Sequence, residues 1–172
     1  MTEILWLGRG GQGAFTAAKI LGAAYALNTG CHALAFPSFG PERRGAPVRA
    51  FTKLDHKPIS DRSETEKADY IIILDDTLYT ENLQNLLKSG GKILINTKQT
   101  DLKQILSFDG DALARELRLP VVNTVMMGAL AGISGIVSIE NLHQAIQNYM
   151  PEKIREKNKS AVQKAAEEAA VL

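Results

Sequence analysis

Short apolar runs alternate along the chain with longer stretches in which apolar residues recur at helical spacing. Residues 70–74, a tyrosine followed by aliphatic residues only, form the clearest short run. A continuous run of this kind is typical of a strand that is covered on both faces of a sheet. By the same pattern we expect strands at residues 4–7, 32–36, 48–54, 70–74, 92–96 and 120–122. Helical spacing predicts helices at residues 14–27, 79–88, 111–117, 124–137, 139–150 and 151–171.

Alternating strands and helices predict an α/β fold with a doubly wound, mostly parallel sheet and helices on both faces, which is a Rossmann-like arrangement. Residues 48–54 return directly from a loop rich in proline and glycine, which indicates one local antiparallel excursion. The length of 172 residues fits a single domain over residues 1–172. The last helix has a narrow face made mainly of alanine, which suits packing either against a partner chain or on its own domain.

Composition excludes several classes of function. The formal net charge is +1, from 20 basic and 19 acidic residues, so we expect no nucleic-acid partner. The longest apolar runs are too short for a membrane span, and the first residues lack the features of a signal peptide, so we expect a cytoplasmic protein without a membrane partner. The one cysteine, Cys31, cannot hold an iron–sulfur cluster, which usually takes four thiolates. Any such cluster must lie on another chain.

A glycine-rich turn separates the first expected strand from the first expected helix. Gly8, Gly10 and Gly13 match the pattern G-x-G-x-x-G, in which backbone N–H groups and a helix N-terminus can approach a phosphate. A dinucleotide site also needs an acidic residue after the second strand, and residues 28–36 contain none. NAD binding is therefore disfavoured, and the turn remains either an anion or cofactor contact or a tight structural turn.

The loop at residues 36–48 is the most informative segment. Two aromatic rings precede the adjacent Arg43 and Arg44, and Pro37, Pro41 and Pro47 stiffen the chain around them. Arginine binds carboxylates or phosphates through two hydrogen bonds, and a stiff loop loses little entropy on docking. We therefore interpret the loop as a docking surface, with a solvated basic loop as the alternative.

Other candidate chemistry is sparse. His32, His56 and His143 lie far apart without the spacing of a zinc site, and we expect no metal ligands. Asp75 and Asp76 follow the buried strand and are expected to cap the next helix rather than act as a base or metal ligand. Cys31 is expected to be a buried, inert thiol. No catalytic residue is predicted.

Together, the glycine turn and the segment Pro41-Glu42-Arg43-Arg44-Gly45-Ala46-Pro47 resemble the gamma subunit of 2-oxoacid:ferredoxin oxidoreductases, particularly the pyruvate or branched-chain type. The resemblance covers essentially the whole chain, including Ser60-Asp61 and the segment from Asn123 to Ala129. It implies an enzyme that converts a 2-oxoacid oxidatively to an acyl-CoA and passes electrons to ferredoxin. This chain would then support assembly and the region of the active site that binds coenzyme A.

The resemblance also implies the cofactors and partners. Thiamine diphosphate, magnesium and [4Fe-4S] clusters would be bound by the alpha, beta and ferredoxin-like delta subunits, and coenzyme A at the shared active site. No cofactor would be bound by this chain alone. The expected cofactor contacts are Gly8, Arg9, Gly10, Gly11, Gln12, Gly13, Arg43 and Arg44. The alternatives are a free-standing nucleotide-binding or regulatory module, a purely structural subunit, or the same subunit in a branched-chain 2-oxoacid or 2-oxoglutarate enzyme.

Overall fold

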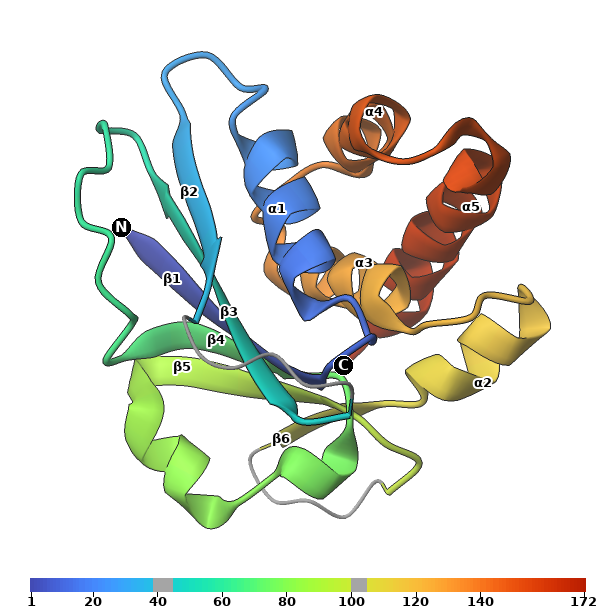
Figure 1. The fold of residues 1–172 in the computed structure, drawn as a ribbon, viewed down its shortest axis with the longest axis horizontal. Coiled ribbons are helices and arrows are strands. Elements are labelled where there is room, and N and C mark those ends of the chain that lie inside the picture. Colours follow the sequence, from blue (N-terminus) through green and yellow to red (C-terminus); the bar gives the residue numbers. More distant parts are fainter. Residues whose placement is uncertain (39–44, 100–104) are drawn as a thin grey trace.

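A single six-stranded sheet organises the molecule. The computed structural model describes residues 1–38, 45–99 and 105–172, and within them the strand order is β2-β3-β1-β4-β5-β6 (Figure 1). The strands are β1 (Thr2–Arg9), β2 (His32–Pro37), β3 (Pro47–Asp55), β4 (Ala68–Ile73), β5 (Leu87–Asn96) and β6 (Ile105–Phe108). The helices are α1 (Ala14–Tyr25), α2 (Gly110–Glu116), α3 (Asn123–Ser134), α4 (Ile139–Tyr149) and α5 (Glu152–Ala169), with 3-10 helices η1 (Asp76–Leu78) and η2 (Glu81–Leu86).

The pairing of the strands confirms the predicted fold class. Strands β1, β4, β5 and β6 run parallel, whereas β3 pairs antiparallel with both β1 and β2. The antiparallel excursion lies where the proline–glycine loop predicted it, between β2 and β3. The sheet is therefore mixed and mostly parallel.

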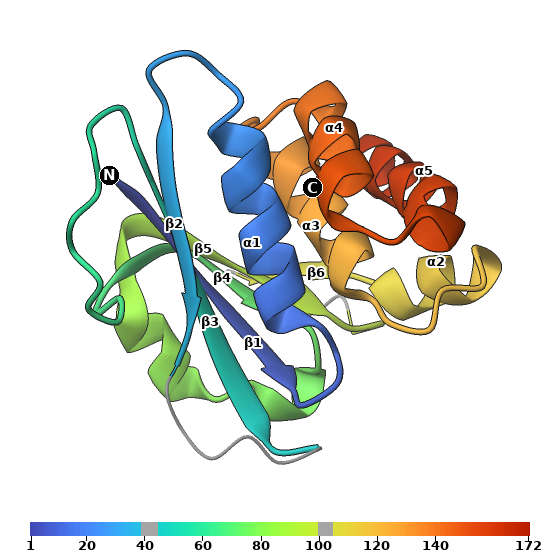
Figure 2. The same ribbon diagram turned by 45° about the horizontal axis from the view of Figure 1, so that its top comes forward.

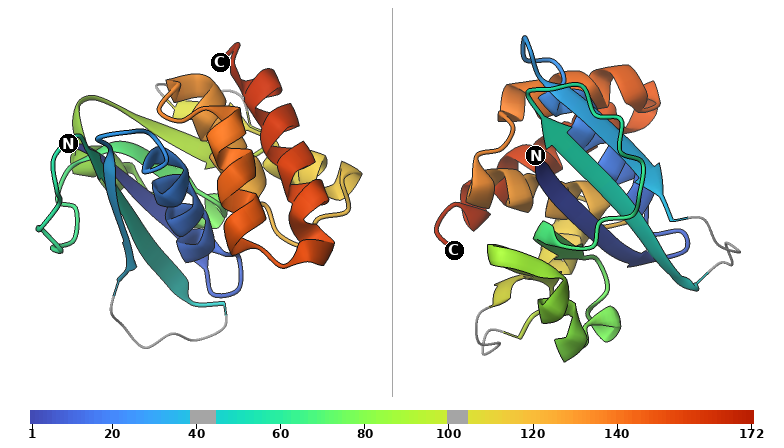
Figure 3. Two further views of the ribbon diagram at one scale, coloured as in Figure 1. Left: turned by 90° about the horizontal axis from the view of Figure 1, so that it is seen from above. Right: turned by 90° about the vertical axis from the view of Figure 1, so that its left-hand side faces the viewer.

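The two faces of the sheet are covered differently. Figures 2 and 3 show α1 and α3–α5 together on one side, where they bury alternate residues of the strands such as Ile4, Trp6 and Ile72. The other face buries the intervening residues, such as Leu5 and Ile71, beneath η1, η2 and their connections. Because consecutive side chains of a strand point to opposite faces, the continuous apolar run in β4 serves both cores.

The alanine face of α5 packs against α3 of the same chain, which decides between the partner chain and the own domain as its packing surface. A Cβ atom added to Gly128 would lie 2.5 Å from the Val162 carbonyl oxygen, and one added to Gly132 would lie 2.2 Å from that of Ala166. The two glycines, four residues apart, thus let the backbones of the helices touch. The alanine face of α5 packs within its own fold. Among the described residues, no helix combines the length and apolar character needed to cross a membrane.

Two predicted elements are wrong. Residues 79–88 form the short η2 and the start of β5 instead of one α-helix, so Gly90 and Gly91 lie inside a strand and do not end a helix. Gly91 is needed there because a Cβ atom would lie 2.9 Å from the Ala68 carbonyl oxygen. Residues 120–122 form no strand: Val122 is buried as the N-cap of α3. The sixth strand is β6 instead, which the sequence pattern missed.

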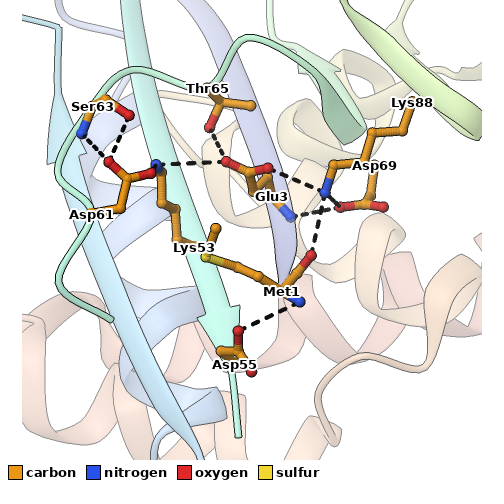
Figure 4. Close-up of polar contacts among 9 residues, drawn as sticks. All are labelled: Met1, Glu3, Lys53, Asp55, Asp61, Ser63, Thr65, Asp69 and Lys88. Carbon is orange, nitrogen blue, oxygen red and sulfur yellow. Dashed lines mark hydrogen bonds and ion pairs between the residues drawn. The ribbon is translucent and has the colours of Figure 1, made fainter. Parts of the chain in front are cut away.

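A buried lysine fastens the long connection between β3 and β4. Lys53 is 1% exposed, and its Nζ lies 2.6 Å from Asp61 Oδ2 and 3.6 Å from Glu3 Oε1 (Figure 4). Glu3 also pairs with Lys88, which in turn reaches Asp69 at 2.8 Å. The Lys53–Asp61 ion pair, together with a 3.2 Å hydrogen bond from Thr65 Oγ1 to Glu3 Oε1, holds residues 56–67, which form no helix or strand of their own, to the sheet.

Candidate functional site

The point where chain connections change direction lies between β1 and β4. After β1 the chain enters α1 on one face, and after β4 it enters η1 on the other. In open α/β sheets, ligands bind in the crevice at the carboxyl ends of two such strands. Here that crevice is bordered by the glycine turn, Gly8 to Gly13, and by Asp75.

The glycines of the turn have different roles. Gly11 and Gly13 adopt positive φ angles of 96° and 77°, which disfavour other residues. Gly13 is also the N-cap of α1, and a Cβ atom on it would lie 2.4 Å from Asn123 Nδ2, which donates a hydrogen bond to the Gly13 carbonyl. Gly13 therefore allows the close approach of α3, while nothing lies within 4 Å of a Cβ atom built on Gly11.

Arg9, Gln12 and Asp75 form one hydrogen-bonded cluster. Arg9 Nε and Gln12 Nε2 both donate to Asp75 Oδ2, at 3.1 and 3.3 Å, and the Arg9 amide donates to Gln12 Oε1 at 2.7 Å. Asp75 Oδ1 also caps η1 by accepting from the Thr77 amide, which confirms the predicted capping role. Burial raises the pKa of Asp75, but the Thr77 hydrogen bonds and the Arg9 charge outweigh it and hold the pKa below its ordinary value. The Asp75 carboxylate thus fixes the shape of the turn.

The fold joins the two motifs that carried the sequence prediction. The Gly10 amide donates to the Ala46 carbonyl at 2.8 Å, and the Gly45 amide donates to the Gly10 carbonyl at 3.2 Å. Arg9 Nη1 also donates to the Gly45 carbonyl at 3.2 Å. The end of the proline–arginine loop therefore lies against the glycine turn, although Arg43 and Arg44 themselves fall outside the described residues.

A polar cleft of about 350 Å³ opens beside the turn. Its walls come from the residues that follow β1, β4, β5 and β6: Gln12, Leu74, Asp75, Asp76, Asn96, Thr97, Lys98, Gln99, Asp109 and Asp111. Carboxylates outnumber the cations in this lining, so the cleft itself suits hydroxyl, amide or amino groups better than phosphates.

The part of the cleft at the ends of β5 and β6 contains no residue that was predicted as a cofactor contact. Asn96 bridges two elements there, because its Nδ2 donates to the Leu74 carbonyl at 3.0 Å and its Oδ1 accepts from the Asp111 amide at 3.2 Å. Thr97 Oγ1 donates to Asp76 Oδ2 at 3.0 Å. Their position in the sequence could have predicted these residues, because polar residues that directly follow the strands of a parallel sheet meet at one edge of that sheet.

The remaining candidates lie away from this cleft. Cys31 is half-buried, contrary to the expectation of a buried thiol, and its Sγ lies 3.5 Å from His56 Nδ1. His143 Nε2 contacts the Lys159 carbonyl at 3.1 Å. In the described ranges, no three His, Cys, Asp or Glu side chains are grouped so that they could hold a metal ion.

Comparison with known proteins places the chain in a family. Residues 3–168 match the family described as pyruvate ferredoxin/flavodoxin oxidoreductase. The chain is 45% identical to pyruvate synthase subunit PorC of Methanothermobacter marburgensis, over 97% of each chain. It is 41% identical to the pyruvate/ketoisovalerate oxidoreductases common subunit gamma of Thermococcus litoralis, over 99% of this chain and 98% of the relative.

Solved structures agree with this grouping. The crystal structure of pyruvate oxidoreductase subunit PORC from Thermotoga maritima superimposes with a TM-score of 0.81 at 32% identity, covering 96% of this chain and 95% of that chain. The 2-oxoglutarate:ferredoxin oxidoreductase of Magnetococcus marinus, solved with 2-oxoglutarate, coenzyme A and succinyl-CoA bound, shares the fold with a TM-score of 0.80 at 19% identity. It matches 99% of this chain over 31% of its own length. The chain therefore belongs to the pyruvate ferredoxin/flavodoxin oxidoreductase family, in which it is a gamma-type subunit of a 2-oxoacid:ferredoxin oxidoreductase.

Proposed function

We propose that residues 1–172 act as one gamma-type domain that assembles with alpha, beta and ferredoxin-like delta subunits into a pyruvate:ferredoxin oxidoreductase. The complex decarboxylates pyruvate oxidatively, forms acetyl-CoA and passes the electrons to ferredoxin. The observation that carries this proposal is the 45% identity with a pyruvate synthase subunit over 97% of both chains. A branched-chain 2-oxoacid is the second candidate substrate, because a gamma subunit 41% identical to this chain is common to pyruvate and ketoisovalerate oxidoreductases.

The division of cofactors follows from the residues that this chain contains. One cysteine cannot supply the thiolates of an iron–sulfur cluster, so the clusters belong to the delta subunit in this proposal. Thiamine diphosphate and magnesium are assigned to the alpha and beta subunits in this proposal. The bound thiamine diphosphate would supply the carbanion chemistry of the reaction. This chain would complete the wall of the active site that receives coenzyme A.

Coenzyme A fits the cleft in part. A volume of about 350 Å³ lies at the low end of ligand pockets and takes only a portion of so long a molecule. The side chains of Gln12, Asn96 and Thr97 suit the hydroxyl and amide groups of the ligand, whereas the carboxylates repel its phosphates. The phosphates instead require the cations of the neighbouring loop. Arg44 directly precedes Gly45, which is hydrogen-bonded to the glycine turn.

Kinetics of the assembled enzyme test this assignment. Arg44→Ala should raise the KM for coenzyme A by about 30-fold or more, because losing one partner of a desolvated charge pair costs about 2–5 kcal/mol. Arg44→Lys should lie between Arg44→Ala and the wild type, since it keeps the charge and loses the two-pronged geometry. Arg62→Ala, at an exposed arginine of residues 56–67, is the matched control. Unchanged KM values for both Arg44 variants would remove the loop from the coenzyme A site.

A further inference from the structure

Arg9 joins three segments that lie far apart in the sequence. Each of its guanidinium nitrogens donates to a protein acceptor: Nε to Asp75 Oδ2 at 3.1 Å, Nη2 to Thr77 Oγ1 at 2.7 Å, and Nη1 to the Gly45 carbonyl at 3.2 Å. The first acceptor follows β4, the second belongs to η1, and the third precedes β3. Arginine suits such a junction, because its planar fork holds several N–H groups in fixed directions.

The surroundings of Arg9 argue against direct contact with a phosphate. The Asp75 carboxylate lies 3.1 Å from Arg9 Nε and compensates its charge. Among the described residues, the lining of the cleft includes Gln12 and Asp75 but not Arg9. The glycine motif predicts Arg9 as a cofactor contact, whereas its side chain is directed to other parts of the protein.

Two residues of the cleft wall depend on Arg9 for their orientation. Asp75 Oδ2 accepts from both Arg9 Nε and Gln12 Nε2, and Gln12 Oε1 accepts from the Arg9 amide at 2.7 Å. Without the guanidinium group, the Asp75 carboxylate would lose one donor and its charge partner. It could then rotate, and the Gln12 side chain would lose its fixed partner.

The third partner of Arg9 fixes the chain beside the cleft. The pairing of β1 with β3 ends at Arg9 and Pro47, and it is continued by the hydrogen bonds of Gly10 with Ala46 and Gly45. Gly45 adopts a positive φ angle of 81°, so the chain changes direction there. The hydrogen bond from Arg9 to the Gly45 carbonyl therefore holds this change of direction against the glycine turn.

We propose that Arg9 is a positioning residue for coenzyme A, which holds Gln12, Asp75 and Gly45 in the arrangement that the ligand requires without touching the ligand itself. This inference rests on the proposed function, because it takes coenzyme A as the ligand of the cleft. In this role the hydrogen bonds of Arg9 act together. A positive charge alone therefore does not replace the guanidinium group.

Kinetics of the complex reconstituted with the proposed partner subunits separate positioning from direct contact. Arg9→Ala should raise the KM for coenzyme A by about tenfold and lower kcat much less, since hydrogen bonds from a charged group are lost. Arg9→Lys should raise this KM as much as Arg9→Ala, because one ammonium group cannot reach acceptors in three segments. A direct phosphate contact would be largely retained by lysine. A KM for Arg9→Lys close to that of the wild type would overturn the inference.

Thr77 provides an independent test, because it lies outside the described lining of the cleft. Its Oγ1 accepts from Arg9 Nη2 and donates to Asp75 Oδ1. Thr77→Val removes both bonds and should raise the KM for coenzyme A by about threefold. The double variant with Arg9→Ala should be no worse than Arg9→Ala alone, since both changes disrupt one network. A wild-type KM for Thr77→Val, or additive effects, would contradict positioning by Arg9.

Arg155→Ala is the matched control. Arg155 is also half-buried, and its Nε donates to the Met150 carbonyl at 2.8 Å, but it is not among the described residues that line the cleft. This variant should leave the KM for coenzyme A unchanged. An increase equal to that of Arg9→Ala would trace the effect to general destabilisation and overturn the inference.

Hydrogen exchange in the free chain tests the structural step separately. The Gly45 amide, which donates to the Gly10 carbonyl, should exchange about tenfold faster in Arg9→Ala than in the wild type. Unchanged exchange would overturn the inference and leave the proposed function intact. A wild-type complex that does not reduce ferredoxin with pyruvate and coenzyme A would overturn the proposed function and this inference with it.

Discussion

Replacing Gly132 by alanine probes the closest helix contact in the fold. The new Cβ atom would lie 2.2 Å from the Ala166 carbonyl oxygen and 2.8 Å from its Cα, whereas ordinary contact begins at 3.4 Å. Both neighbours are backbone atoms of α5, so no side-chain rotation relieves the overlap. The helix would have to move by about 1 Å, and overpacking of this kind costs about 1–3 kcal/mol.

The net effect includes a gain from helix propensity. Alanine in a helix interior is favoured over glycine by about 1 kcal/mol. Because the overlapping atoms belong to rigid backbone, we place the cost of overpacking at the upper end of its range, about 3 kcal/mol. After the propensity gain is subtracted, we expect Gly132→Ala to lower the free energy of unfolding by about 2 kcal/mol. For a domain of this size, that corresponds to a fall of roughly 4–8 °C in melting temperature.

Gly22→Ala is the matched control within α1. A Cβ atom there would lie 3.4 Å from Ala33 Cβ and 3.6 Å from Thr52 Cγ2, which is ordinary contact. The helix propensity gain then remains, and the free energy of unfolding should rise by up to about 1 kcal/mol. Urea unfolding followed by circular dichroism measures both variants. The reasoning is refuted if the two substitutions shift stability in the same direction.

Three further predictions concern the turn, the buried lysine and the free chain. Gly13→Ala should destabilise the chain by about 1 kcal/mol more than Gly11→Ala in urea unfolding, because it also disrupts the partly buried hydrogen bond from Asn123; equal effects would contradict this. Hydrogen bonds from Lys53 and Ser63 lower the pKa of Asp61 below its ordinary value. The ionised Asp61 should therefore stabilise the fold fully above a pH of about 4, the ordinary pKa of aspartate, and progressively less as the pH falls below it. The melting temperatures of wild type and Asp61→Asn should therefore converge as pH falls below that value, and a constant difference would count against the ion pair. The purified chain should contain no stoichiometric iron and reduce no dye with pyruvate; iron at one cluster per chain would contradict the cofactor assignment.

Local sequence signals predicted the first half of the fold well. The apolar run of β1, the glycines after it and the alanine-rich α1 follow each other in the expected order. The prediction succeeded because positive φ angles at Gly11 and Gly13 make glycine a local requirement of that turn. The return of β3 after a loop with several prolines was predicted for a similar reason, since proline there prevents a continuous helix or strand.

Errors arose where apolar residues or glycines serve tertiary contacts. Val122 is apolar because it is buried beside Gly110, whose added Cβ would lie 2.7 Å from it, and not because it belongs to a strand. Gly91 resembled a helix stop, but it accommodates the backbone of Ala68 in the neighbouring strand. Both requirements come from residues distant in the sequence, so no local pattern contains them.

Most of the candidate site also depends on distant contacts. The sequence identified the glycine turn, but the carboxylate that fixes it, Asp75, lies 66 residues beyond Arg9. The contact of Gly45 with Gly10 likewise follows from the pairing of β1 with β3. Resemblance to the gamma subunits associated the glycine turn with the proline–arginine loop. The hydrogen bonds of Gly10 with Gly45 and Ala46 give the physical basis of that association.

Reconstitution of the enzyme tests the central claim most directly. The proposed partner subunits, alpha, beta and delta, are combined with or without this chain, and pyruvate- and coenzyme A-dependent reduction of ferredoxin is measured. We expect activity only when the chain is present, in a complex that contains it in a fixed ratio to the other subunits. Full activity without the chain, or no stable association with the other subunits, would contradict its role as the gamma subunit.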